Sequence, residues 1–440
     1  MRLPRYGEYK DSGTWLGLIP STWAAVRLKW VASVNDDVLP ETTNTDYEIE
    51  YVDIGSVSLD RGIERTERIN FADAPSRARR LVRDGDILVS TVRTYLKAIA
   101  PVVTPPGNLV VSTGFAVVRP ALQLLSRYGK YALQATGFVD EVISRSTGVS
   151  YPAINASDLV RICVPVPPAE EQSAIAAFLD RETAKIDALI AEQEKLIALL
   201  AEKRQTTISH AVTKGLNPNA PMKDSGIAWL GEVPAHWEVK QLRHFAEVLR
   251  GKFTHRPRND PAFYDGGYPF VQTGDITGAS RYIQSFRQTL NERGTSVSKE
   301  FPSGTLVMAI AANIGDVAIL TFPAYFPDSI VGLVPKLGVD LPFLYYLMTA
   351  MKTPMMQTAT VSTQLNLNVD QISSLVAGCP PVSEQAAIAA FLDAELERLE
   401  ALQAEAERGI ELLKERRSAL IAAAVTGQID VRGQVEDIAI

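Results

Sequence analysis

The sequence has few of the residues that build disulfide frameworks and metal sites. It contains two cysteines, Cys163 and Cys379, and four histidines in 440 residues. No His-Glu-x-x-His or Cys-x-x-Cys spacing occurs. A disulfide framework is therefore excluded, and we expect no metal site. Both cysteines are interpreted as small buried apolar residues.

Long hydrophobic runs are also missing. The longest, such as Leu306 to Ala312, are far shorter than the roughly 20 apolar residues that a membrane-spanning helix needs. The N-terminus has no apolar signal core. The composition, 46% hydrophobic and 22% charged, is typical of globular proteins. We therefore expect a cytoplasmic protein without membrane contact.

The motifs of several enzyme classes do not occur. The sequence has no phosphate-binding loop of the Gly-x-x-x-x-Gly-Lys-Ser/Thr type and no nucleophile elbow of a serine hydrolase. It also lacks the glycine-rich cofactor loop and the Asn/Asp-Pro-Pro-aromatic turn of an amine methyltransferase. A nuclease cluster of carboxylates stays open, because Asp and Glu are frequent. We predict no catalytic residue, no bound cofactor and no metal in this chain.

The sequence instead contains an internal repeat. Residues 10–28 recur at 223–242 with one inserted residue, and share Lys-Asp-Ser-Gly, Trp-Leu-Gly and Pro-x-x-Trp. Residues 167–180 recur at 380–393, and share Pro-Pro, Glu-Gln and Ala-Ile-Ala-Ala-Phe-Leu-Asp. Two weaker pairs relate 52–55 to 271–274 and 154–155 to 367–368. The chain is thus two copies of a unit, each a variable globular part followed by a constant helical part, and pseudo-twofold symmetry follows.

Each copy ends in a stretch that predicts a long helix. Residues 169–212 contain no proline or glycine and repeat apolar side chains every seven residues, and the second copy does the same apart from Gly409. The simplest packing is an antiparallel coiled coil, although packing of each helix on its own domain alone remains open. We expect these residues to pair the helices and bind partners: Phe178, Leu179, Ile186, Ile190, Ile197, Leu200, Phe391, Leu392, Leu396, Leu399, Ile410 and Leu413.

The variable parts are predicted to be mixed helix and strand, which gives an α+β fold class with two globular domains and two long helices. Their strand order cannot be derived from the pattern. The repeated tryptophans are assigned to the core or to packing on the helices. The expected strands are 47–54, 86–90, 109–112, 115–118, 269–272, 305–309, 317–320 and 330–334, and the expected helices are 122–136 and 342–352.

Local positive charge distinguishes the variable parts. The net charge of the chain is −7, but most of the acidity lies beyond residue 379, whereas basic and polar residues gather in both variable parts. Such stretches suit phosphate and base contacts, although a surface arginine cluster is often only solvated charge and the polar loops can be turn chemistry. The predicted nucleic-acid-binding residues are Arg77, Arg79, Arg80, Arg93, Lys97, Arg145, Tyr151, Arg250, Lys252, Arg256, Arg258, Asn313, Gln364 and Asn366.

This order of motifs, with Ile/Val-Pro-x-x-Trp, a variable part and Pro-Pro-x-x-Glu-Gln-x-x-Ile-x-x-Phe-Leu-Asp occurring twice, closely resembles the specificity subunit of type I restriction-modification enzymes. The resemblance covers nearly the whole chain. It implies target recognition domains at 1–165 and 216–378, spacer helices at 166–215 and 379–428, and a C-terminal tail at 429–440.

By the same resemblance, each domain reads one half of a split asymmetric site in double-stranded DNA. Two methyltransferase subunits then methylate adenine N6, and motor-nuclease subunits restrict unmodified DNA in defence of the cell. The cofactors S-adenosylmethionine, ATP and Mg²⁺ are expected only in those partners. Two alternatives stay open: a coiled-coil scaffold that binds no DNA, and the recognition subunit of another split methyltransferase system.

Overall fold

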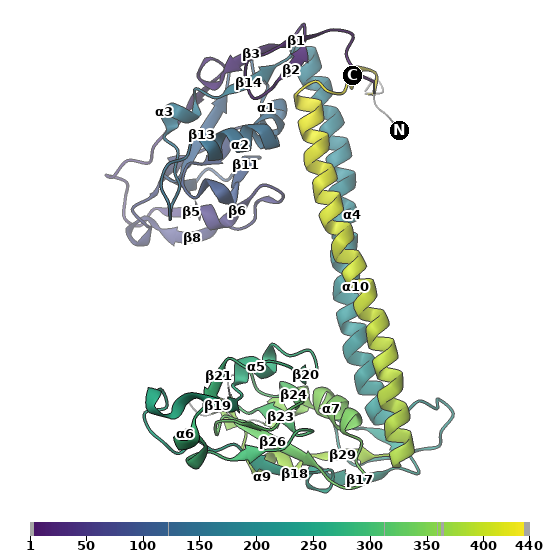
Figure 1. The fold of residues 1–440 in the computed structure, drawn as a ribbon. Coiled ribbons are helices and arrows are strands. Elements are labelled where there is room, and N and C mark those ends of the chain that lie inside the picture. The colour runs from purple at the N-terminus through teal and green to yellow at the C-terminus, as the bar shows by residue number, and fades with distance from the viewer. Residues whose placement is uncertain (1–3, 122, 312, 359, 362–364, 435–440) are drawn as a thin grey trace. The chain divides into compact units, whose positions relative to one another are not determined.

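The computed structural model describes residues 4–434 except 122, 312, 359 and 362–364. The chain forms two compact units, residues 1–194 with 407–440 and residues 195–406. Each unit combines a globular α+β domain with one end of each of two long helices, which confirms the predicted fold class (Figure 1). Within the described residues, none of the helices combines the length and apolarity that a membrane span requires.

Two four-stranded sheets build the domain of the first unit. One has the order β11 (Ile99–Pro101), β10 (Ile87–Ser90), β13 (Phe115–Pro120), β4 (Ala32–Val34). The other has the order β8 (Glu67–Asn70), β5 (Glu48–Val52), β12 (Leu109–Ser112), β9 (Ala78–Leu81). The two-stranded pairs are β1 (Tyr9–Asp11) with β2 (Leu18–Pro20), β3 (Ala24–Arg27) with β14 (Cys163–Val166), and β6 (Val57–Ser58) with β7 (Gly62–Ile63). The short helices are α1 (Ser126–Gln134), α2 (Thr136–Ser144), α3 (Ala156–Leu159), η1 (Leu28–Trp30), η2 (Ile54–Ser56), η3 (Phe71–Asp73), η4 (Thr94–Leu96) and η7 (Arg432–Gln434).

The second unit contains a five-stranded and a four-stranded sheet. The first has the order β18 (Ala246–Arg250), β26 (Ile330–Pro335), β23 (Leu306–Ala309), β24 (Val317–Leu320), β20 (Tyr282–Ile283). The second has the order β21 (Gln288–Leu290), β19 (Tyr264–Phe270), β25 (Ala324–Tyr325), β22 (Glu300–Phe301). Its pairs are β15 (Met222–Asp224) with β16 (Glu232–Pro234), β17 (Glu238–Gln241) with β29 (Val376–Cys379), and β27 (Thr360–Val361) with β28 (Leu365–Asn366). The short helices are α5 (Thr273–Thr277), α6 (Glu292–Ser296), α7 (Leu341–Ala350), α8 (Lys352–Thr358), α9 (Val369–Ser374), η5 (Leu242–His244) and η6 (Pro261–Phe263).

The two domains share one topology despite their divergent sequences. The order β4-β13-β10-β11 corresponds to β18-β26-β23-β24, and β8-β5-β12-β9 corresponds to β21-β19-β25-β22. A parallel strand pair lies at the same place in each domain, β5 with β12 and β19 with β25, and the second domain adds a parallel pair of β20 with β24. The weak sequence repeat of residues 154–155 and 367–368 also occupies matching places in the two domains. Ile154 N donates to Thr91 O, just after β10, at 2.9 Å, and Leu367 N donates to Ile310 O, just after the corresponding strand β23, at 3.3 Å. The repeat in the sequence is therefore a repeat of the fold.

The sequence located the main strands correctly and missed the short ones. Each of the eight predicted strands overlaps an observed strand, and α7 confirms the helix predicted at 342–352. The helix predicted over 122–136 is observed as α1, which begins only at Ser126. The two-stranded pairs were not predicted, because strands of two to four residues are too short to show a clear alternating pattern.

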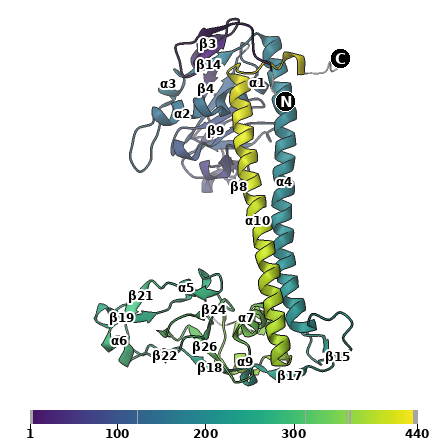
Figure 2. The same cartoon turned by 45° about the vertical axis from the view of Figure 1, so that its right-hand side comes forward.

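The long helices are α4 (Ala169–Lys214) and α10 (Val382–Val425), and they pack antiparallel in both units (Figure 2). In the first unit Leu179 of α4 shares a buried cluster with Val425 near the end of α10. In the second unit Leu200 of α4 shares a buried cluster with Leu396 near the start of α10. The predicted antiparallel pairing is thus confirmed. The helix α10 continues through Gly409, and nothing in the structure explains a glycine there.

Ion pairs accompany this apolar packing. Arg417 of α10 donates to Asp187 of α4 at 2.9 Å in the first unit, with the arginine side chain only 11% exposed. In the second unit Arg204 of α4 pairs with Glu400 of α10 at 3.0 Å. Opposite charges on facing helices fix their register as well as adding stability.

The cysteines are less buried than predicted. Both Cys163 and Cys379 are half-buried, which corrects the expectation that they are buried. Each lies in a strand that pairs with a single neighbour, β14 or β29, so one side of the ladder stays open.

The repeated tryptophans Trp23 and Trp237 provide a matched test of one hydrogen bond. Both are fully buried, and Trp23 Nε1 donates to Glu171. Trp237 Nε1 has no hydrogen-bond partner among the described residues, and the matching Glu384 bonds His236 at 2.8 Å instead. We expect Trp23→Phe to lower the free energy of unfolding by about 1 kcal/mol more than Trp237→Phe, since only the first removes a hydrogen bond. Urea denaturation of the two variants measures the difference, and equal losses would contradict it.

Candidate nucleic-acid interface

A cavity in the first domain brings together three residues predicted to bind nucleic acid. It has a volume of about 550 Å³ and is lined by Arg77, Arg93 and Tyr151 together with Tyr51, Asp53, Ile54, Gly55, Val92, Leu96 and Ser112. These residues come from β5, β12, η2 and η4, from the positions just before β9, η2 and η4, and, for Tyr151, from the segment between α2 and α3. The Arg93 guanidinium lies 4.9 Å from the centre of the Tyr151 ring, and Tyr151 is 65% exposed. A cation and an aromatic face are thus offered to the same ligand.

The backbone around this cavity is unusual. Arg93 and Lys97 flank η4 with φ angles of 49° and 52°, in the left-handed region that residues other than glycine seldom adopt. Among the described residues neither side chain has an ion-pair partner, and the same is true of Arg77. All three are exposed. Three cations are therefore available to an anionic ligand.

Other predicted residues of this domain are engaged elsewhere. Arg79 lies over the ring of Phe71 at 4.8 Å and donates to a backbone carbonyl. Arg80 is half-buried, and burial lowers the pKa of its guanidinium. Arg145 pairs with Glu141 one helical turn away at 2.6 Å. The sequence cluster is thus divided between the cavity and the body of the domain.

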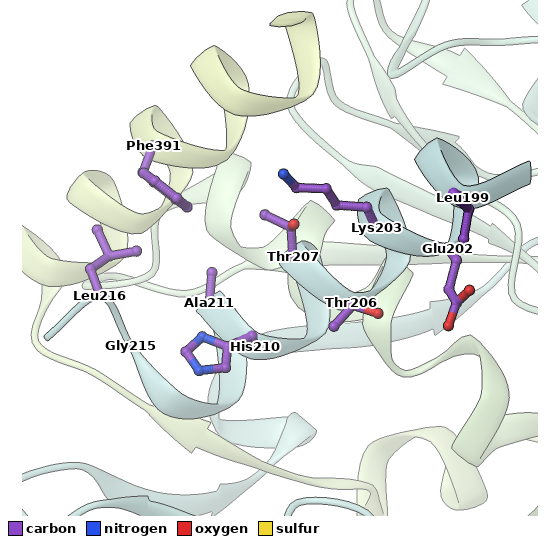
Figure 3. A pocket seen from close by; sticks show the side chains of 10 residues that line it. All are labelled: Leu199, Glu202, Lys203, Thr206, Thr207, His210, Ala211, Gly215, Leu216 and Phe391. Carbon is purple, nitrogen blue, oxygen red and sulfur yellow. The ribbon is translucent and has the colours of Figure 1, made fainter. Parts of the chain in front are cut away.

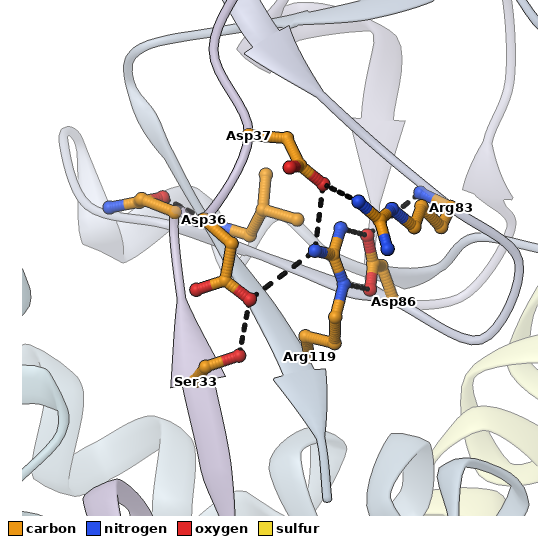
Figure 4. Close-up of polar contacts among 8 residues, drawn as sticks. Ser33, Asp36, Asp37, Arg83, Asp86 and Arg119 are labelled. Atoms are coloured by element: carbon orange, nitrogen blue, oxygen red, sulfur yellow. Dashed lines mark hydrogen bonds and ion pairs between the residues drawn. The ribbon is translucent and has the colours of Figure 1, made fainter.

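An ion cluster of the first domain, in which Asp86 is buried and the other members are partly or largely exposed, was not predicted (Figure 4). Arg119 binds both oxygens of Asp86 at 2.8 and 2.9 Å, Asp37 at 2.8 Å and Asp36 at 3.3 Å. Arg83 pairs with the same Asp37 at 2.8 Å. The hydrogen bond from Arg119 is the main reason that the pKa of Asp37 lies below its ordinary value. Arg83 is therefore occupied by this cluster.

In the second domain the tertiary structure adds an acid to the predicted basic stretch. Asp328, from the loop between β25 and β26, forms ion pairs with Arg258 and, at 3.6 Å, with Arg256. Its backbone carbonyl accepts a hydrogen bond from Arg250 at 2.8 Å. Lys252 is exposed and has no ion-pair partner among the described residues. The local charge is thus lower than the sequence suggests.

The structure describes only some of the remaining predicted residues of the second domain. Asn313 is exposed and donates to Thr277 at 3.0 Å. Gln364 lies outside the described residues, and Asn366 belongs to β28 with its side chain outside the description. Across the described part of the chain, no group of His, Cys, Asp or Glu side chains is arranged to hold a metal ion.

The residues predicted to pair the helices differ in exposure. Phe391 is 43% exposed, while its counterpart Phe178 is 4% exposed. The half-buried residues are Ile190, Ile197 and Leu413. The buried ones are Phe178, Leu179, Ile186, Leu200, Leu392, Leu396, Leu399 and Ile410.

Phe391 lines a groove that sequence reasoning missed (Figure 3). The groove has a volume of about 770 Å³, and exposed Leu199 and Leu216 lie in it with Phe391. Lys203 and His210 of α4 supply polar atoms at its wall. An exposed apolar surface of this kind with polar neighbours is typical of a protein-docking site.

Comparison with known proteins gives a family match over both copies of the repeat. The family described as "Type I restriction modification DNA specificity domain" matches residues 20–198 and again 234–411. A putative type I restriction enzyme MjaX specificity subunit of Methanocaldococcus jannaschii is 26% identical over 97% of this chain and 98% of the relative. The HindI specificity subunit of Haemophilus influenzae is 22% identical over 74% of this chain and 83% of that protein. Both relatives are named as specificity subunits, and neither as a scaffold.

Solved structures give the same fold. A chain from a study of complex assembly and conformational transition of the type I R-M system superposes with a TM-score of 0.72 at 22% identity, covering 92% of this chain and 98% of that one. The HsdS subunit of Thermoanaerobacter tengcongensis gives a TM-score of 0.53 at 22% identity, covering 96% and 100%. These likenesses concern the fold, because the identities are low.

Proposed function

Because the chain belongs to the type I restriction modification DNA specificity family, we propose that it reads a split, asymmetric DNA target for a restriction-modification complex. The family consists of recognition subunits without catalytic activity of their own. One observation carries the proposal: the family match is duplicated, and the two matched domains share a sheet order while their sequences diverge. One fold with two different surfaces suits two different half-sites.

The two domains are assigned to the half-sites by their position in the repeat. Residues 1–165 form the first recognition domain and residues 216–378 the second, and the segments 166–215 and 379–428 are spacers. The start of α4 at Ala169 and of α10 at Val382, each just after a Pro-Pro pair, supports these boundaries. The spacer helices set the number of unread base pairs between the half-sites.

The DNA contacts of the first domain centre on the cavity of Arg77, Arg93 and Tyr151, with Lys97 beside it. Exposed cations without internal partners contribute to phosphate neutralisation, and arginine also binds guanine edges in the major groove. In the second domain Lys252 is the corresponding free cation, and Arg250, Arg256 and Arg258 contribute when DNA phosphates compete with Asp328. The modest net charge of −7 is accommodated because partner subunits share the phosphate contacts.

Two methyltransferase subunits are the proposed protein partners. They bind the paired helices, methylate adenine N6 and carry S-adenosylmethionine, while motor-nuclease subunits with ATP and Mg²⁺ join for restriction in the cytoplasm. The exposed groove of Leu199, Leu216 and Phe391 supports docking on the helices, because a solvated apolar surface gains free energy when a partner covers it.

The experiment that tests this function is a base-resolution map of N6-methyladenine in the source genome with the gene intact and deleted. We expect one split motif to lose methylation on deletion. Exchange of residues 1–165 for the first domain of another family member is then expected to change one half-site and leave the other intact. A change in both halves would contradict the modular assignment. If no motif depends on the gene, the recognition function is wrong, and a scaffold that binds partners without DNA has to be tested by pull-down.

A further inference from the structure

One position in the two domains keeps its backbone but changes its side chain. Asp53 follows β5 in the motif of residues 52–55, and Gln272 occupies the matching place in residues 271–274 after β19. Each precedes a short helix, η2 or α5, with φ and ψ of −95° and 174° for Asp53 and −105° and 164° for Gln272. The scaffold is therefore the same at this point. A side chain that differs on a shared scaffold is a candidate for discrimination between targets.

The environment of Asp53 leaves half of its carboxylate open. Asp53 lines the cavity of about 550 Å³ that holds Arg77 and Arg93, and also a neighbouring one of about 330 Å³ that holds Arg65. Ser56 donates to its Oδ1 at 2.6 Å and in turn accepts from Arg65 at 3.3 Å. Within the described residues, Oδ2 accepts no hydrogen bond and the carboxylate forms no ion pair. Asp53 is thus held in place at one oxygen and free at the other.

A free carboxylate on a surface that binds phosphates weakens the binding of DNA, because like charges repel. It is favourable where a base presents an amino group, and carboxylates in DNA interfaces accept from the N4 amine of cytosine. The same carboxylate disfavours bases that present only acceptors, which increases specificity. Neighbouring Arg77 and Arg93 supply the attraction to phosphate that Asp53 does not.

The matching position in the second domain has a different hydrogen-bonding character. Gln272 donates through Nε2 to Oε1 of Gln288 on β21 at 3.0 Å, and both side chains are half-buried. This amide pair offers donors and acceptors together, the combination that recognises the N6 and N7 edge of adenine. Position 272 thus presents a neutral edge where position 53 presents a negative one.

We propose that residues 53 and 272 are equivalent base-discriminating positions: Asp53 accepts from a cytosine amine in one half-site, and the Gln272–Gln288 pair binds an adenine edge in the other. The inference rests on the proposed function and deepens it. It assigns a specific base contact to each domain, and a substitution at one of the two positions is expected to leave the contact of the other domain unchanged.

The test is to co-express the full chain with the methyltransferase subunits of its own cell and to map the methylated motif of each variant. Asp53→Asn keeps the size of the side chain and an acceptor for Ser56 but adds a donor. We expect it to reduce discrimination at one position of one half-site by about tenfold, with the other half-site and the spacer unchanged. Gln272→Glu is expected to act in the same way on the other half-site.

The matched control is Asp46→Asn, which makes the same chemical change at an exposed position of the first domain. If the Asp53→Asn variant methylates the same motif as the wild type, the inference is wrong, but the proposed function stands. If the wild-type chain directs no methylation, both the inference and the proposed function are wrong. If Asp53→Asn loses all methylation, Asp53→Glu must restore it with the same base preference, because it restores the carboxylate. Failure of that rescue would also overturn the inference.

Discussion

Replacement of Arg119 by methionine is expected to lower the free energy of unfolding of the first domain by about 3 kcal/mol or more. Among the described residues, the substitution leaves the carboxylate of Asp86, whose side chain is 1% exposed, with the backbone N–H of Arg83 as its one remaining donor. Breaking a buried ion pair from one side is far more costly than losing a surface pair, because an uncompensated charge stays inside the fold. Chemical denaturation of the purified chain measures the loss.

Two further variants separate this cause from a general effect of losing an arginine. Arg68→Met removes a surface ion pair to Glu50 at 3.3 Å, with the arginine 72% exposed, and is expected to cost less than about 1 kcal/mol. Addition of Asp86→Asn to Arg119→Met removes the buried charge and is expected to recover part of the stability. A double variant as unstable as Arg119→Met would show that packing, and not charge, dominates.

The ion cluster also predicts a pH dependence. Arg119 holds the pKa of Asp37 below its ordinary value, so the stabilisation from Asp37 is complete above the unfolded pKa of about 4 and is lost as the pH falls through the lower folded pKa. The stability of the wild-type domain should therefore fall more steeply below pH 4 than that of Arg119→Met. Denaturation curves between pH 3 and pH 7 test the sign.

Replacement of Leu200 by lysine is the second change with a large expected effect. Leu200 is 8% exposed and belongs to the buried cluster that joins α4 to α10 in the second unit. Lysine there loses apolar burial and places a charge among apolar side chains, which we expect to cost about 3 kcal/mol. Combined with Leu413→Lys at a half-buried position of α10, it should abolish co-purification of the methyltransferase subunits.

Leu199→Lys is the matched control for stability, because the neighbouring Leu199 is 53% exposed in the groove with Phe391. It should leave the unfolding transition within about 0.5 kcal/mol of wild type. If it nevertheless loses the methyltransferase subunits, the groove is part of the docking surface. An unchanged complex with both Leu200→Lys and Leu413→Lys present would contradict the paired helices as the assembly platform.

Residues at equivalent positions of the two repeats can have different surroundings, which the sequence alone does not predict. Phe178 and Phe391 occupy identical motifs, yet one is buried and the other lies open in a groove, because the surroundings supplied by the rest of each unit differ. Likewise the stretch from Arg250 to Arg258 contains no acid, but the fold brings Asp328 against it from a distant loop. Neither difference has a local sequence signal.

The sequence by itself determined the duplication, the two long helices and the principal strands, because the duplication shows as repeated motifs and heptad spacing, strand runs and Pro-Pro boundaries act over a few residues. The antiparallel pairing of the helices was the simplest packing that the sequence suggested, and the buried clusters that join α4 to α10 established it. Only the tertiary structure decided the common sheet order, the convergence of Arg77, Arg93 and Tyr151 on one cavity, and the ion cluster around Arg119. Those features depend on contacts between residues far apart in the chain. Their charges and exposures are set by what the fold places opposite them, which no local pattern records.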